Sequence, residues 1–234
     1  MGMNNPLPKI KVCGVTRDVD LELLAEAGVD TVGLNFVPAS PRCLDLPRAG
    51  QLSAHAAALG LNRVAVVMNP TTQQLKQLFA VADFEFLQLH GAELPSLLDE
   101  FAGAGFGIIK AISWSGRAEE AELAGIWQRS LEEQANVTPS LQAFLVDAFA
   151  PGVGGGTGKL ARWELLQPRP TEIANVPLLL AGGLHPGNVA AAIAATQPAG
   201  VDTASGVESS PGIKSPELVQ RFASNAKAAW VRLS

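Results

Sequence analysis

Short apolar runs recur along the chain at a nearly regular interval, and this repetition limits the folds open to it. Each run is rich in Val, Ile, Leu or Phe and is bounded by Gly, Pro or Asn, which is typical of short buried strands. The runs begin about 27 residues apart on average, close to the length of one strand-plus-helix unit. We expect eight strands, at residues 9–14, 31–36, 63–69, 84–90, 107–113, 143–149, 177–182 and 200–205.

Longer amphipathic stretches lie between most of these runs. Residues 18–28, for example, open on an Asp that can cap a helix and close on Gly28, a common helix stop. We expect helices at residues 18–28, 71–82, 93–103, 116–135, 160–167, 186–196 and 215–232.

Strands that alternate with helices predict a parallel α/β sheet, either open and doubly wound or closed into a (β/α)8 TIM barrel. Two features favour the barrel. Eight units is the number that closes a barrel, and polar residues occupy the carboxyl ends of nearly all the expected strands. No linker or low-complexity tract divides residues 1–234, so we expect a single barrel domain with a loose leader at 1–8.

Composition excludes several classes of protein. The 17 Lys and Arg against 22 Asp and Glu give a formal charge of −5, which argues against nucleic acid or an anionic membrane as the main partner. No apolar run approaches the ~18 residues of a membrane span, and the amino terminus does not resemble a secretory signal. Two cysteines cannot form a disulfide framework. We therefore expect a cytoplasmic globular protein.

Side chains that alternate along a strand place several reactive groups on one face. In the first strand Lys11 and Cys13 share a face, and in the fourth Gln88 and His90 do so. Asp147 ends the sixth strand. The carboxyl ends of barrel strands carry the active site, so these residues are expected to converge at one rim. Each also has a structural interpretation: a buried thiol, a loop-binding His, a capping Asp or an ion-paired Lys.

Glycine clusters follow the last three expected strands, at residues 152–158, 181–184 and 204–208. Successive glycine amides can surround an anion, and loops at this end of a barrel often bind phosphate. The alternative is that these glycines only form tight turns. In the second loop Arg42 is the single cation of residues 35–44, suited to a carboxylate ligand or simply solvated.

Six motifs, taken in order, resemble the phosphoribosylanthranilate isomerase family of tryptophan biosynthesis. AGGL alone is shared by many phosphate-binding barrels, but the combination of KVCG, SPR, QLHG, GGTG and SGVE is specific. The motifs are KVCGVTR (11–17), GLNFVPASPR (33–42), LQLHG (87–91), FLVDAFAPGVGGGTG (144–158), LLLAGGLHPGNV (178–189) and VDTASGVESSPGIKS (201–215).

The resemblance implies an Amadori rearrangement of N-(5-phosphoribosyl)anthranilate. It implies that Cys13 is the general base, that Asp147 is the general acid and that Arg42 holds the anthranilate carboxylate. Substrate contacts are expected from Lys11, Gln88 and His90. Phosphate contacts are expected from Gly156, Gly158, Gly182, Gly183, Ser205 and Gly206. No metal, nicotinamide or flavin is implied, and the protein is expected to be a monomer or homodimer.

The chemistry sets requirements on both catalytic groups. To protonate the furanose ring oxygen near neutral pH, Asp147 needs a pKa raised from about 3.9 by burial. To remove the ribose C2′ proton as a thiolate, Cys13 needs a pKa lowered modestly from about 8.5. Lys11 is placed either to stabilise that thiolate or to form an ion pair inside the barrel.

Other functions remain open at this stage. Indole-glycerol-phosphate synthase and ribulose-phosphate epimerase are also phosphate-binding barrels, but the first does not need Cys13 and the second would need paired Asp and metal-binding His residues. A non-catalytic barrel could keep the glycine loops and dispense with Cys13 and Asp147. The sequence is also compatible with a related histidine-pathway substrate.

Overall fold

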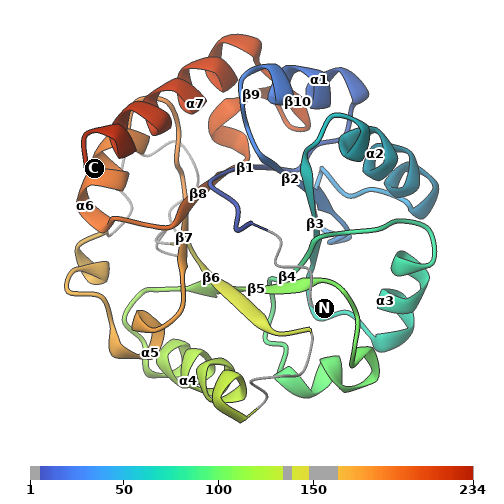
Figure 1. Cartoon of the computed structure of the whole chain (residues 1–234), viewed down its shortest axis with the longest axis vertical. Coiled ribbons are helices and arrows are strands. Elements are labelled where there is room, and N and C mark those ends of the chain that lie inside the picture. Colours follow the sequence, from blue (N-terminus) through green and yellow to red (C-terminus); the bar gives the residue numbers. More distant parts are fainter. Residues whose placement is uncertain (1–5, 134–138, 148–162, 234) are drawn as a thin grey trace.

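The computed structural model describes residues 6–133, 139–147 and 163–233, and these form one closed eight-stranded parallel barrel (Figure 1). The strands are hydrogen-bonded in chain order, and the last closes on the first. The prediction of a barrel is confirmed over a doubly wound sheet. The strands are β1 (Ile10–Cys13), β2 (Thr31–Asn35), β3 (Asn62–Val67), β4 (Phe86–Leu89), β5 (Gly107–Ser113), β6 (Leu141–Asp147), β7 (Leu178–Ala181) and β8 (Gly200–Thr203).

Helices surround the barrel as an outer ring (Figure 1). The α-helices are α1 (Asp18–Glu26), α2 (Leu46–Ala58), α3 (Thr72–Phe79), α4 (Ala118–Glu133), α5 (Thr171–Ala174), α6 (Val189–Thr196) and α7 (Pro216–Val231). Short 3-10 helices are η1 (Pro95–Phe101), η2 (Trp163–Leu166) and η3 (Ser205–Val207).

The helix predictions need correction in four places. Residues 93–103 contain the 3-10 helix η1 and residues 163–167 contain the 3-10 helix η2, rather than α-helices, and residues 160–162 of the second predicted helix lie outside the described residues. The sequence analysis missed α5 and also α2, whose start is marked by the side chain of Asp45, which accepts a hydrogen bond from the amide of Arg48. An Asp cap followed closely by Pro47 is a recognisable helix start, so this signal was present in the sequence.

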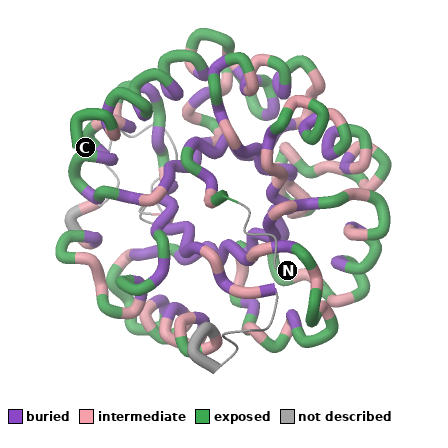
Figure 2. Tube along the Cα trace, in the orientation of Figure 1, coloured by how far each residue is buried: buried purple, intermediate pink, exposed green. Residues whose placement is uncertain are grey.

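Two apolar layers separate the inside of the barrel from its outer jacket. In β1, Ile10 and Val12 belong to the core between strands and helices, whereas Cys13 belongs to a smaller cluster inside the barrel. The same alternation holds in β4, where Leu87 and Leu89 face the helices. In Figure 2 most of the strand trace is buried, and most of the exposed residues lie in the surrounding helices and loops. The predicted strand faces are therefore confirmed.

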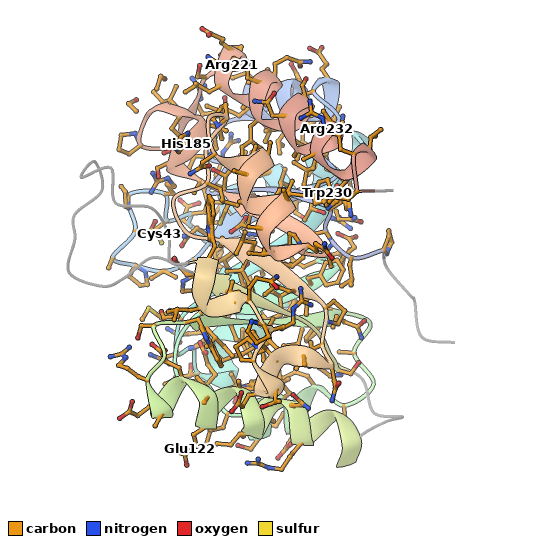
Figure 3. The ribbon with its side chains drawn as sticks, turned by 90° about the vertical axis from the view of Figure 1, so that its left-hand side faces the viewer. Cys43, Glu122, His185, Arg221, Trp230 and Arg232 are labelled. Carbon is orange, nitrogen blue, oxygen red and sulfur yellow. The ribbon has the colours of Figure 1, made fainter. Side chains whose placement is uncertain are left out.

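The two ends of the barrel carry different residues. At the end where the strands begin, the ammonium of Lys9 lies 3.9 Å from the centre of the Trp230 ring. Pro8 is buried and Leu7 packs against the inner cluster, so the packed chain begins by Leu7 rather than after residue 8. Figure 3 shows Cys43 and His185, from loops after β2 and β7, towards the opposite end from Trp230.

A small antiparallel hairpin of β9 (Glu208–Ser210) and β10 (Ile213–Lys214) follows β8 and η3. The hairpin was not predicted from the sequence. Thr16, in the loop after β1, donates a hydrogen bond of 2.8 Å to the carbonyl of Gly212. The hairpin therefore lies against the carboxyl end of β1, where Cys13 is placed.

Candidate active site

A cavity of about 460 Å³ opens where the strands end, and most of the predicted site residues line it. The structure brings together residues from β1, β4, β6, β7 and η3. Those predicted residues are Cys13, Gln88, His90, Asp147, Gly182, Gly183, Ser205 and Gly206. Lys11 lies deeper and Arg42 lies to one side, so neither lines the cavity. Gly156 and Gly158 lie outside the described residues.

Cys13 is held at the last position of β1, opposite Gly33 of β2. A Cβ atom at Gly33 would lie 2.8 Å from the Cys13 sulfur, so the glycine provides the space for the thiol. Burial raises the pKa of the Cys13 thiol, although the charges of Lys11 and Lys214 act to lower it. The expected downward shift is therefore wrong for this structure, because loss of hydration outweighs both cations.

Lys11 forms a buried ion pair with Asp202, a residue that the sequence analysis missed. The Lys11 ammonium lies 2.8 Å from an Asp202 carboxylate oxygen, and the two residues are register partners on β1 and β8. Burial alone would lower the pKa of Lys11, but Asp202 and Cys13 raise it above its ordinary value. Both expected roles of Lys11 are thus present, since one ammonium both pairs with a carboxylate and acts on the thiol.

Asp202 could have been found from the alternation of β8. Its neighbour Val201 belongs to the outer core, which leaves Asp202 facing inward. It lines the cavity, and its negative charge acts to raise the pKa of Cys13. The thiol therefore lies between opposing charges, and its titration depends on their balance.

Gln88 and His90 interact with each other at the mouth of the barrel. The Gln88 Nε2 atom lies 3.0 Å from His90 Nδ1. Burial and the charge of Lys11 lower the pKa of His90, which favours a neutral ring at physiological pH. Gln88 is buried, yet its Oε1 atom has no hydrogen-bond partner among the described residues. An orphaned buried acceptor beside a cavity is a position for a donor on a ligand.

Backbone amides converge on the other side of the cavity. Among the described residues, the amides of Gly182, Gly183 and Ala204 make no hydrogen bond, and all three residues line the cavity. The loop after β7 is fixed by Thr203, whose hydroxyl donates to the carbonyl of Leu184 at 2.7 Å. A Cβ atom at Gly206 would collide with that same carbonyl. The close approach requires glycine there, and the unpaired amides favour an anion.

The guanidinium of Arg42 is paired with a carboxylate of the same chain rather than free in solvent. Its Nε donates to Glu208 Oε1 at 2.8 Å, and its Nη2 bonds the other oxygen of the same carboxylate. The Glu208 side chain is 3% exposed and also accepts from the ammonium of Lys214 at 2.7 Å. Glu208 and Lys214 lie within the motif 201–215, but neither was predicted from the sequence to have a role in the site.

Asp147 ends β6 and pairs in register with Ser113 on one side and Ala181 on the other. It is half-buried. It also lines a second cavity of about 340 Å³, shared with His90 and bordered by α4. Asp147 therefore borders both cavities at the mouth of the barrel.

The described residues contain no group of three or more His, Cys, Asp or Glu side chains placed to hold a metal ion. No helix among them is both long and apolar enough to cross a bilayer.

Comparisons with known proteins agree with one another. The sequence model of the family described as N-(5'phosphoribosyl)anthranilate (PRA) isomerase matches residues 10–225. The N-(5'-phosphoribosyl)anthranilate isomerase of Myxococcus xanthus is 40% identical over 220 residues, covering 94% of this chain and 96% of the relative. That of Rubrobacter xylanophilus is 38% identical over 222 residues, covering 95% and 100%.

Solved structures give the same result. Phosphoribosyl anthranilate isomerase from Thermotoga maritima matches with a TM-score of 0.76 and 30% identity, covering 95% of this chain and all of that chain. A phosphoribosyl anthranilate isomerase in complex with reduced 1-(o-carboxyphenylamino)-1-deoxyribulose 5-phosphate matches with a TM-score of 0.73 and 28% identity over the same shares.

Proposed function

The chain belongs to the N-(5'-phosphoribosyl)anthranilate isomerase family, and we propose that Cys13 and Asp147 carry out its acid-base chemistry. The protein catalyses the Amadori rearrangement of N-(5-phosphoribosyl)anthranilate to 1-(2-carboxyphenylamino)-1-deoxyribulose 5-phosphate, a step of tryptophan biosynthesis. The observation that carries the proposal is that Cys13 and Asp147 line one cavity together with unpaired backbone amides.

In the first step Asp147 acts as the general acid. It donates its proton to the furanose ring oxygen, the bond from that oxygen to C1′ breaks, and a Schiff base forms between C1′ and the anilino nitrogen. The position of Asp147 at the end of β6 supports this role, because its side chain lines the same cavity as Cys13.

In the second step Cys13 acts as the general base. The Schiff base withdraws electrons from C2′, and the Cys13 thiolate removes the C2′ proton to give an enolamine, which tautomerises to the ketone. Lys11 and Lys214 support the thiolate, since both cations act to lower the pKa of Cys13. Lys11 does so from below the cavity, as a positioned charge rather than as a ligand for the substrate.

Three groups of residues are assigned to three parts of the substrate: the phosphate, the anthranilate carboxylate and the region between them. We assign the phosphate to the loops after β7 and β8, through Gly182, Gly183, Ser205 and Gly206, with Gly156 and Gly158 proposed from the resemblance alone. We assign Gln88 Oε1 and His90 to hydrogen bonds with the part of the substrate that lies between its phosphate and its carboxylate. Arg42 is assigned to the anthranilate carboxylate through a charge-assisted hydrogen bond.

Replacing each catalytic group separately tests this assignment. Cys13→Ala and Asp147→Asn should each abolish turnover, followed through anthranilate fluorescence, while binding of the reduced product analogue persists. Cys43→Ser is the matched control, because Cys43 is an exposed cysteine in the loop after β2 and should leave turnover unchanged. Wild-type rates in either catalytic variant would refute the acid-base assignment.

We also propose that the chain acts as one catalytic barrel domain in the cytoplasm, as a monomer or homodimer. The Thermotoga maritima enzyme is described as dimeric, with monomers generated from it, so both states are represented among the relatives. Light scattering coupled to size-exclusion chromatography measures the state directly. A mass above that of a dimer would contradict the proposal.

A further inference from the structure

The carboxylate of Glu208 joins two cations that come from distant parts of the chain. It accepts hydrogen bonds from two nitrogens of Arg42, 166 residues away, and from Lys214, six residues away. Its side chain is 3% exposed, and that of Lys214 is fully buried. The hairpin amide of Gly212 also points to Glu208, at 3.3 Å. A buried carboxylate with this many donors is fixed in position.

Arg42 is constrained from the opposite side by the loop after β1. A Cβ atom at Gly14 would collide with the Cδ atom of Arg42, so the aliphatic part of the side chain lies directly on this glycine. Gly14 also has a φ of +71°, which a non-glycine residue rarely adopts. Glycine and Glu208 together therefore define one orientation of the guanidinium, next to the carboxyl end of the strand that carries Cys13.

Lys214 links the same carboxylate to the strand ends. Its ammonium donates to the carbonyl of Cys13 at 2.7 Å and to that of Ala204 at 3.4 Å, so it joins the end of β1 to the end of β8. Lys214 does not face the cavity, and neither does Glu208. Glu208 therefore acts on the site through the residues that it holds, whereas the charge of Lys214 also acts to lower the pKa of Cys13.

We propose that Glu208 is a positioning residue for substrate recognition: its two-point contact orients Arg42 and leaves Nη1 of the guanidinium to bind the anthranilate carboxylate. Nη1 makes no hydrogen bond among the described residues. This inference rests on the proposed role of Arg42. Because Glu208 accepts both Nε and Nη2, a long side chain with several rotatable bonds is already ordered before the substrate arrives, which reduces the entropy lost on binding.

The test measures two fragments of the substrate separately. Free anthranilate carries the carboxylate and inorganic phosphate carries the other anion, and their inhibition constants report on the two ends of the cavity. Glu208→Gln is close in shape and removes the charge that Arg42 pairs with. It should weaken inhibition by anthranilate about tenfold or more and raise KM for the substrate similarly, while inhibition by phosphate stays within a factor of two.

Glu217→Gln is the matched control, since Glu217 forms an exposed ion pair with Arg221 on α7. It should change neither constant. Where Glu208→Gln does not fold, Glu208→Asp replaces it, because the shorter carboxylate keeps its charge but cannot reach both Arg42 and Lys214. Equal weakening of anthranilate and phosphate would indicate a purely structural role for Glu208 and would overturn the inference.

A second variant separates this inference from the function on which it rests. Arg42→Ala should weaken inhibition by anthranilate at least as much as Glu208→Gln does. The double variant should bind anthranilate no more weakly than Arg42→Ala alone. If Arg42→Ala leaves anthranilate inhibition unchanged, the carboxylate role of Arg42 is wrong. If Arg42→Ala weakens it and Glu208→Gln does not, the role of Arg42 stands and the positioning role of Glu208 is wrong.

Discussion

The ammonium of Lys11 lies 2.8 Å from the carboxylate of Asp202, inside the barrel and beneath the thiol of Cys13. The two charges oppose each other at that thiol, because Lys11 lowers the pKa of Cys13 and Asp202 raises it. In the wild-type protein burial has a larger effect than either charge, and it raises the pKa of the Cys13 thiol above its ordinary value. The pair therefore offers a way to change the basicity of Cys13 in either direction.

Replacing one member of this pair at a time should move the titration of Cys13 in opposite directions. Lys11→Met removes a cation and should raise the pKa of Cys13, whereas Asp202→Asn removes an anion and should lower it. The measurement is the rate of alkylation by iodoacetamide against pH, since only the thiolate reacts. Both are made in a Cys43→Ser background, because Cys43 is exposed and would react as well. An unchanged midpoint in both variants would disprove the coupling.

Gly33→Ala should impair catalysis without unfolding the protein. The added Cβ atom would lie 2.8 Å from the Cys13 sulfur and would force the thiol out of its position. We expect kcat to fall by about tenfold or more, because small displacements of a reacting group are costly. Gly125→Ala on α4 is the control, since there the new atom meets only the end of the Arg129 side chain. Equal kcat values for the two variants would show that the thiol has room to move.

Glu120→Gln should destabilise the protein at neutral pH and much less in acid. Burial alone would raise the pKa of Glu120, but hydrogen bonds from Ser115 and Arg117 hold it below its ordinary value. A carboxylate with a lowered pKa stabilises the folded state above its unfolded pKa, and this stabilisation is lost as the pH falls. Urea unfolding should show a loss of about 2 kcal/mol at pH 7 that shrinks towards pH 3.

The neighbouring residue supplies the control for this pH dependence. Glu119 is exposed and makes no hydrogen bond or ion pair among the described residues, so Glu119→Gln should change stability by less than about 0.5 kcal/mol at either pH. A loss in Glu120→Gln that stays constant from pH 7 to pH 3 would contradict the charge-based explanation.

Lys110→Met should be far more destabilising than Lys76→Met, although both lysines pair with a glutamate. Lys110 is fully buried, bonds Glu93 at 3.0 Å and donates to the carbonyls of Leu89 and Gly91. Removal of the Lys110 ammonium leaves the buried carboxylate of Glu93 without a cation and should lower the free energy of unfolding in urea by about 3–5 kcal/mol. Lys76 and Glu100 are half exposed, so loss of their ion pair in Lys76→Met should lower the free energy of unfolding by at most about 1 kcal/mol. Similar losses in the two variants would count against the burial argument.

The positions of the barrel strands along the sequence could be predicted because they depend on neighbouring residues. Buried parallel strands are short and apolar throughout, and each expected run contains an observed strand or overlaps it closely. Alternation also placed Cys13, Gln88 and His90 correctly on the side that lines the cavity, since neighbouring side chains on a strand must face opposite ways. The helix α2 was missed although the Asp45 cap was visible, because the residues before it read as one long loop.

By itself, the sequence determined the eight strands of the barrel, the inward face of those strands and the family. What only the tertiary structure decided is which charges meet: Lys11 with Asp202, 191 residues apart, and Arg42 with Glu208, 166 residues apart. The raised pKa of Cys13 also belongs to the tertiary structure, because burial acts on the thiol through all of its neighbours at once. The physical reason is that strand faces follow from the geometry of adjacent residues, whereas ion pairs and desolvation depend on closure of the barrel, which brings the ends of β1, β2 and β8 together.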